Sequence, residues 1–172
     1  MAVLKIRTYP DPVLRSKARE VTNIDGALQR LIDDMIETMY AAPGVGLAAP
    51  QVGIPLRLAV IDVSTKDEES PLMVLVNPEI ISTEGEQNGE EGCLSVSDFQ
   101  SVVTRFAKVR VKATDREGKP YEVSGEGLLA RAFQHEIDHL NGVLFIDRIS
   151  PLKRGLFKRR VRKNLKEDKA AI

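Results

Sequence analysis

Both histidines of this 172-residue chain, His135 and His139, lie in the stretch QHEIDHLNG, residues Gln134–Gly142. They are four residues apart with Glu136 between them, a spacing that a helix turns into neighbours on one face. With His135 at zero and about 100° per residue, His139 lies at about 40° and Glu136 at about 100°. The segment is therefore expected to fold as a helix that presents two imidazoles and a carboxylate together.

The predicted helix, residues 127–141, also has an apolar face that would enter a core. Opposite the histidines lie Ala130, Phe133, Ile137 and Leu140. The histidine face carries Leu128, Arg131 and Ala132 and would line a cleft.

The pattern HExxH is typical of metal-dependent hydrolases, in which two histidines bind the ion and the glutamate moves the protons of a water. The alternative is a helix whose histidines have this spacing by accident. Because burying unligated imidazoles costs free energy, the apolar surroundings favour a metal site.

A tetrahedral catalytic site usually takes three protein ligands and a water, so one ligand is missing from the helix. No third histidine exists, and the only later glutamate, Glu167, lies in a charged tail. Cys93, the single cysteine, is the natural third ligand. The competing interpretation is a small buried core residue, the commoner fate of a free cysteine.

Composition limits the class of protein. Hydrophobic residues at 42% and charged residues at 29% are typical of one compact globular domain. Lys plus Arg and Asp plus Glu are both 25, which gives the whole chain no preference for DNA or for a membrane surface. No apolar run is long enough to cross a bilayer, no secretory signal precedes Pro10, and a lone cysteine fits a reducing cytoplasm.

Strand patterns dominate the middle of the chain and helix patterns its ends, so the predicted class is α+β. Helices are predicted over residues 25–41, over 127–141 and from Ser150-Pro151 onward, strands over 56–63, 72–81 and 107–115 with a hairpin partner near 121–125, and a loop over the acidic, glycine-rich residues 83–92. Residues 1–150 are expected to form a single catalytic domain, with residues 151–172 a basic helix and tail packed on it.

Three segments together resemble peptide deformylases of the bacterial type. They are GVGLAAPQ (44–51), EGCLS (91–95) and QHEIDH (134–139), in the family's order, and YPDPVLR (9–15) is also similar. The resemblance implies antiparallel β-sheets wrapped around the central HExxH helix, with an N-terminal helix and a C-terminal basic helix. One departure is Val96-Ser97-Asp98-Phe99, where the bacterial pattern usually continues with an aliphatic residue and proline.

The resemblance implies hydrolysis of the formyl group from the amino-terminal formyl-methionine of new polypeptides, with release of formate. It makes Cys93, His135 and His139 the ligands of one divalent ion, with Fe²⁺ native and Zn²⁺, Ni²⁺ or Co²⁺ as replacements. Glu136 would transfer the protons. The Gln51 side-chain amide and the Leu94 backbone N–H would stabilise the oxyanion.

For the substrate, the resemblance implies that Gly46 and Gly92 lie against the peptide and that Val45 is a wall of the methionine pocket. Leu128 and Ala132 are expected to line the same pocket, and Arg131 to extend to the cleft rim. Asp138 is expected either to steady a metal ligand or to pair with Arg105.

The segment from Pro151 onward has nine Lys or Arg and two acids, so it predicts a helix with a basic outer face. Its expected apolar stripe is Leu152, Leu156, Val161 and Leu165. In bacterial members this helix docks on the ribosome near the tunnel exit, so ribosomal RNA is an expected partner and a solvated surface the alternative.

Three rivals to the deformylase prediction remain. A small HExxH zinc peptidase would need a downstream third ligand, which the chain does not convincingly offer. An RNA-binding module with a structural metal would prefer four closed ligands, and a Cys93–His hydrolase would work without metal.

Overall fold

The structure, a computed structural model, describes residues 2–170. In this range the chain forms three α-helices, seven strands and three short 3₁₀-helices: η1 (Pro12–Arg15), α1 (Gly26–Ala41), β1 (Gly46–Ala48), η2 (Ala49–Val52), β2 (Leu58–Ile61), β3 (Met73–Glu84), β4 (Gln87–Cys93), β5 (Val96–Arg105), β6 (Lys108–Thr114), β7 (Pro120–Glu126), α2 (Gly127–Leu140), η3 (Phe145–Arg148) and α3 (Pro151–Ala170). None of the described helices is long and apolar enough to cross a membrane.

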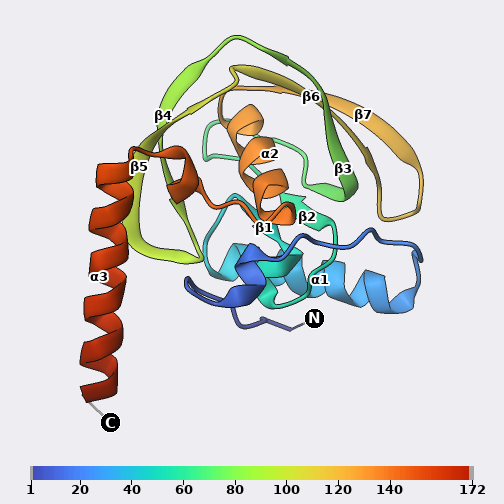
Figure 1. Ribbon diagram of the computed structural model, residues 1–172. Helices are drawn as coiled ribbons and strands as arrows, with labels where there is room; N and C mark the ends of the chain where they lie inside the picture. The colour runs from blue at the N-terminus through green and yellow to red at the C-terminus, as the bar shows by residue number, and fades with distance from the viewer. Residues whose placement is uncertain (1, 171–172) are drawn as a thin grey trace.

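The strands form two antiparallel sheets. One has the order β1-β2-β3-β6-β7, and the other is the hairpin β4-β5. Figure 1 shows the sheets arching over α2, with α1 on the side of β1 and β2. The predicted α+β class with antiparallel sheets is confirmed.

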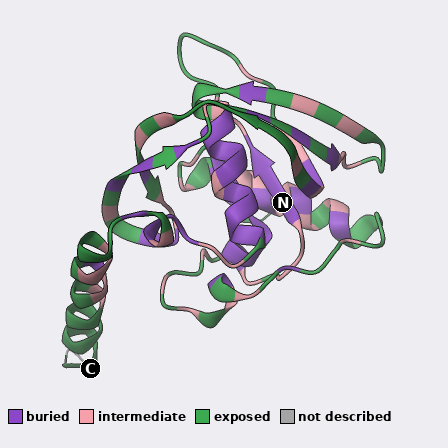
Figure 2. Ribbon diagram, turned by 45° about the horizontal axis from the view of Figure 1, so that its top comes forward, coloured by how far each residue is buried: buried purple, intermediate pink, exposed green. Residues whose placement is uncertain are grey.

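Helix α2 packs its apolar face on the five-stranded sheet. Ala130, Phe133, Ile137 and Leu140 join a core cluster with residues of β2, β3 and β6. Helix α2 lies close to β7, since a Cβ at Gly125 of β7 would lie 2.8 Å from side-chain atoms of Leu129 and Phe133. Nearly the whole of α2 is buried in Figure 2. Its polar residues are therefore held inside the protein as well.

Helix α1 supplies a second core. Asp25 caps it by accepting a hydrogen bond from the Leu28 N–H at 2.9 Å. The buried residues Leu28, Ile32, Met35 and Met39 recur at helical spacing and pack against β1 and β2. The packing of α1 thereby fixes residues 44–48, which contain Gly44 and Gly46, beside α2.

The prediction of a loop over residues 83–92 is wrong, because most of this segment is strand. β4 pairs with β5, a segment whose sequence pattern predicts no element. Glycine and acidic residues usually disfavour strands, but here the glycines make room for arginine and glutamine side chains. A Cβ at Gly89 would lie 2.9 Å from the Arg131 guanidinium, and one at Gly92 would lie 3.2 Å from Gln100 Cγ.

Helix α3 begins as predicted, with Ser150 Oγ accepting from the Lys153 N–H at 3.2 Å and Pro151 in the first turn. Of its expected apolar stripe, Leu152, Leu156 and Leu165 are exposed, and Val161 is half-buried against the cluster that contains Phe157. Phe157 is instead its buried residue, and it packs on Tyr9 and Phe99. In Figure 1 α3 stands beside β5 and extends away from the rest of the protein.

Candidate metal centre and active site

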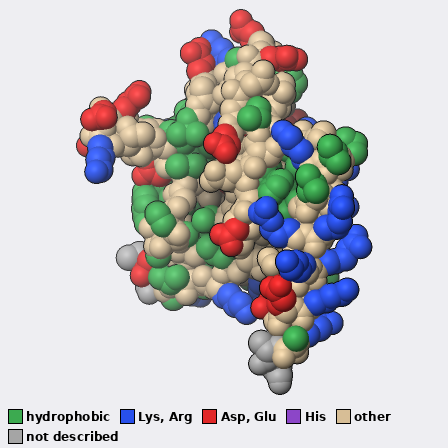
Figure 3. All heavy atoms as spheres, turned by 90° about the vertical axis from the view of Figure 1, so that its left-hand side faces the viewer, with side chains coloured by type: hydrophobic (Ala, Val, Ile, Leu, Met, Phe, Trp, Pro, Cys, Tyr) green, Lys and Arg blue, Asp and Glu red, His purple; other side chains and the backbone are tan. Residues whose placement is uncertain are grey.

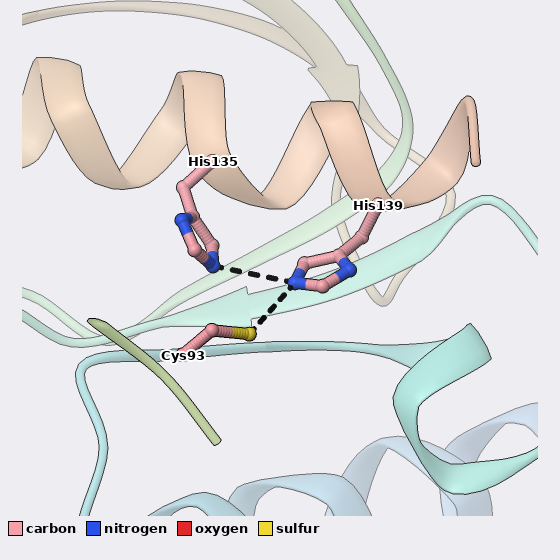
Figure 4. A group of neighbouring side chains, drawn as sticks. All are labelled: Cys93, His135 and His139. Atoms are coloured by element: carbon pink, nitrogen blue, oxygen red, sulfur yellow. Dashed lines mark hydrogen bonds between the residues drawn. The ribbon is translucent and has the colours of Figure 1, made fainter. Parts of the chain in front are cut away.

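Three donor atoms from two distant segments meet at the buried end of a cavity. Cys93 ends β4, and His135 and His139 lie one turn apart on α2. Cys93 Sγ is 3.3 Å from His139 Nε2, which is 3.2 Å from His135 Nε2. All three donor atoms lie within 4.8 Å of one another, and Figure 4 shows the side chains converging.

This donor set fits a divalent metal ion. A thiolate and two imidazole nitrogens are ligands that zinc and ferrous iron both accept. The two Nε2 atoms face each other at hydrogen-bond distance in a buried place, where a shared cation gives both of them a partner. Burial lowers the pKa of His139 well below its usual value, which keeps this ring neutral as a ligand must be, whereas at His135 burial is outweighed by Cys93 and Glu91, which raise the pKa.

Glu91 holds the outer side of His135. The His135 Nδ1–H donates to Glu91 Oε1 at 2.9 Å, which leaves Nε2 directed at the other donors. The Arg105 guanidinium donates to both Glu91 oxygens, at 2.9 and 2.8 Å. Burial tends to raise the pKa of Glu91, but Arg105 and His135 outweigh it and hold the pKa well below its usual range.

Glu91 was missed among the predicted site residues, because its segment was interpreted as a loop. The signal that could have found it is its place in EGCLS, two residues before Cys93. In a strand, residues two apart share a face, so Glu91 and Cys93 both point toward α2.

Asp138 is the partner of two arginines and contacts neither histidine ligand through a hydrogen bond in the described residues. It accepts from Arg105 Nη1 at 2.7 Å and from Arg148 Nε at 2.6 Å. Of its two expected roles, the structure shows the ion pair with Arg105. Arg105 thus ties Glu91 of β4 to Asp138 of α2.

Glu136 lies beside the donor cluster, with its carboxylate packed over Gly46. A Cβ at Gly46 would lie 2.6 Å from Glu136 Oε1, so only glycine leaves room for this contact. Glu136 Oε2 is buried and has no hydrogen-bond partner within the described residues. Burial raises the pKa of Glu136 to about 7, a value suited to a group that takes and returns a proton near neutral pH.

Gln51 is buried and held at both ends of its amide. Its Oε1 accepts from the Ala48 N–H at 2.9 Å, and its Nε2 lies 3.1 Å from Ser95 Oγ and 3.6 Å from Cys93 Sγ. The amide N–H₂ group is thereby directed at the metal centre. Leu94 follows Cys93 in the tight turn to β5, and a Cβ at Gly44 would lie 2.9 Å from its Cδ1.

The cavity has a volume of about 430 Å³ and opens to solvent over exposed apolar side chains. All the expected substrate residues line it: Val45, Gly46, Gly92, Leu128, Arg131 and Ala132. Val45 and Leu128 are 43% and 48% exposed, so both can contact a ligand directly.

Arg131 does not extend to the cleft rim as expected. Its side chain is buried, and its guanidinium pairs with Glu91 and donates to the Val103 carbonyl at 3.1 Å. Arg131 turns inward because a buried Glu91 carboxylate with too few hydrogen-bond donors would cost free energy. Gly89 gives the guanidinium its path across β4.

A cysteine, two histidines and a buried glutamate around an accessible cavity define a mononuclear metallohydrolase site. Residues 3–155 match the family described as polypeptide deformylase, and the chain belongs to this family. It is a peptide deformylase, a hydrolase that removes N-formyl groups. Its family membership favours this activity over that of a small zinc peptidase.

Relatives with the same name are similar along nearly the whole chain. The peptide deformylase of Syntrophobacter fumaroxidans is 59% identical over 167 residues, which are 97% of this chain and 98% of the relative. The crystal structure of a peptide deformylase from Legionella pneumophila has a TM-score of 0.89 at 53% identity and covers 97% of this chain and 98% of its own. That of Synechococcus elongatus, in complex with actinonin, has a TM-score of 0.86 at 45% identity and covers 91% of this chain and 86% of its own.

Proposed function

We propose that this chain removes the formyl group with one divalent ion held by Cys93, His135 and His139. The observation that carries the proposal is the convergence of these donors, 4.8 Å or less apart, beside the buried Glu136 in an open cavity. A bound ion supplies acidification of a water and polarisation of the formyl oxygen. The residues around the ion transfer the protons and stabilise the developing negative charge.

Glu136 takes the proton of the attacking water and returns it to the departing amine nitrogen. As oxygen adds to the formyl carbon, a tetrahedral intermediate forms. Breaking the bond between the formyl carbon and nitrogen then releases formate and a free amino terminus. The buried, unpartnered Oε2 of Glu136 supports this role, since an oxygen without a partner is free to accept the proton.

Gln51 and Leu94 stabilise the negative charge on the former carbonyl oxygen. The support for Gln51 is its fixed amide, whose Oε1 is used by Ala48 so that the N–H₂ end faces the centre. A backbone N–H at Leu94 adds a second donor. Preorganised donors of this kind need no rearrangement when the charge develops, which is why they accelerate the reaction.

The formyl-methionine side chain fits the apolar part of the cavity. Val45, Leu128 and Ala132 supply its walls, and Gly46 and Gly92 let the peptide backbone approach. The substrate is then the amino terminus of a newly made polypeptide, which supports a location in the bacterial cytoplasm.

The central experiment measures formate release from formyl-Met-Ala-Ser before and after treatment with a chelator. We expect turnover by the loaded enzyme, loss of turnover after chelation and recovery when the ion is returned. Release of formate by the metal-free protein would refute the metal mechanism and favour a cysteine hydrolase that uses Cys93.

We further propose that the native ion is Fe²⁺, with Zn²⁺, Ni²⁺ or Co²⁺ able to replace it. Sulfur and nitrogen ligands suit all four, so affinity alone does not select among them. A thiolate beside an oxidisable ion makes the iron form sensitive to oxygen. Aerobic ageing is expected to inactivate the iron-loaded enzyme and spare the zinc-loaded one; equal decay would contradict Fe²⁺ oxidation as the cause.

The outer face of α3 is proposed to contact ribosomal RNA near the exit tunnel. Its support is the exposed basic side chains of the helix, among them Arg159 and Lys163. Phosphate contacts make such binding fall steeply as salt rises. Cosedimentation with ribosomes that does not change with salt would remove this proposal.

A further inference from the structure

A second hollow of about 400 Å³ lies next to the active-site cavity, between β5 and α3. Its floor is the outer face of the β4-β5 hairpin, where Glu90 and Val102 are direct cross-strand partners and Gln100 is the next residue on the same face of β5. Glu90 and Gln100 also line the active-site cavity. The second hollow, called the α3 groove below, therefore adjoins the active-site cavity at these two residues.

The wall of the α3 groove is one face of α3. Lys153, Leu156 and Arg160 line it beside the buried Phe157. At about 100° per residue, the three lie within about 100° of Phe157 on the same side. The contact that fixes α3 to β5 through Phe157 thus also sets the width of the groove.

The groove offers apolar surface and unpaired positive charge. Val102 and Leu156 are 55% and 53% exposed although both are apolar. Neither Lys153 nor Arg160 takes part in a salt bridge among the described residues, although Arg160 Nη1 donates to the Asp98 carbonyl at 3.0 Å. Figure 3 shows Lys and Arg side chains along α3, with hydrophobic side chains among them toward its upper end.

We propose that the α3 groove binds the part of the substrate polypeptide that follows the formyl-methionine, and that it favours apolar and acidic side chains there. An extended chain advances about 3.3 Å per residue, so a peptide anchored in the active site passes Glu90 and Gln100 within a few residues. Beyond Glu90, whose charge disfavours acids at the junction, Lys153 and Arg160 attract them. This inference rests on the proposed function, because it requires the formylated end to occupy the active-site cavity.

The test compares a short substrate with two long ones. The tripeptide formyl-Met-Ala-Ser is too short to enter the groove, whereas formyl-Met-Ala-Ser-Leu-Glu-Ala-Glu-Ala and its analogue with Lys at both Glu positions extend into it. For the unaltered enzyme at low salt, kcat/KM is expected to be about fivefold higher for the Glu peptide than for the Lys peptide, mainly through KM. The preference is expected to shrink as salt is added.

Two charge-reversal variants locate the effect. K153E is expected to abolish the preference, and K153E/R160E to invert it, while both keep tripeptide turnover. The matched control is R162E/K169E, which makes the same change in net charge on exposed residues about 180° around α3 from Lys153 and Arg160. The single variant K153E is needed because Arg160 also holds the Asp98 carbonyl.

Each outcome decides one question. Loss of the preference in K153E but not in R162E/K169E supports the groove. Equal rates for both long peptides with the unaltered enzyme, or equal effects of both double variants, would overturn it and leave α3 as an RNA-binding or solvated helix. Failure of the tripeptide itself to release formate would instead refute the proposed function.

Discussion

Helices α2 and α3 are both predicted from the sequence but have opposite relations to the rest of the protein. Of the 14 residues of α2, ten are buried, whereas α3 has 20 residues and one buried side chain, Phe157. In α2 the charged residues are inside: Arg131 and Asp138 pair with groups on other elements, and Glu136 lines the cavity with one oxygen unpartnered within the described residues. In α3 most of the charged residues face solvent. Helical periodicity therefore predicts that a segment is a helix. Burial decides whether its polar residues can form part of an active site or are solvated surface residues.

The largest effect is expected for Glu136→Gln on α2. The amide keeps the volume of the side chain over Gly46 but cannot accept the proton, so kcat should fall by about 10²- to 10⁴-fold. Metal content per chain and the unfolding midpoint are expected to stay near their original values. A variant with more than a tenth of the original kcat would show that another group transfers the proton.

Phe133 and Phe157 allow a direct comparison of the two helices, because both side chains are buried. Phe133→Ala should lower the free energy of unfolding by about 3–5 kcal/mol, since it leaves a cavity under the five-stranded sheet. Phe157→Ala should cost about 2 kcal/mol, because α3 can move away instead of leaving a void. Urea unfolding measures both, with the exposed Leu152→Ala as a control; equal losses for the two phenylalanines would contradict the difference between the helices.

Glu91→Gln tests whether the buried charges around α2 steady the metal ligands. The amide still accepts from His135 Nδ1 but loses the charge that pairs with Arg105, so metal affinity is expected to fall about 10- to 100-fold. Competition with a chelating dye measures that affinity without reference to turnover. Asp138→Asn serves as the comparison, since Asp138 pairs with Arg105 but contacts no ligand; an equal loss there would mean that the effect is one of general packing.

The convergence of the candidate ligands could be predicted because they lie in short motifs with chemical meaning. HExxH brings His135, His139 and Glu136 together by helical spacing alone, and the α+β class follows from the position of the strand patterns. What it could not predict depends on contacts between distant segments. Gly89 permits the path of Arg131 across β4, and Phe157 meets Tyr9 and Phe99. Neither contact leaves a periodic signal in its own segment.

The smallest effect is expected where the two helices are joined, at the ion pair between Asp147 of η3 and Arg15 of η1. Burial tends to raise the pKa of Asp147, but the Arg15 guanidinium and the Leu144 N–H outweigh it, so the pKa lies below its ordinary value of 3.8. A lowered pKa in the folded state contributes stability above the ordinary pKa, and this contribution is lost as the pH falls through the folded value. Both side chains are about one-third exposed, so the contribution at neutral pH is at most about 1 kcal/mol.

Asp147→Asn should therefore be slightly less stable than the original chain at neutral pH, and the difference should shrink as the pH falls below 3.8 and vanish below the lowered pKa of the folded state. Urea unfolding at several pH values measures it, with added salt narrowing the gap. If the difference instead persists unchanged into acid, the charge of Asp147 is not its cause, because the asparagine oxygen can still accept from the Leu144 N–H. The ion pair with Arg15 would then contribute nothing measurable to the connection between α2 and α3.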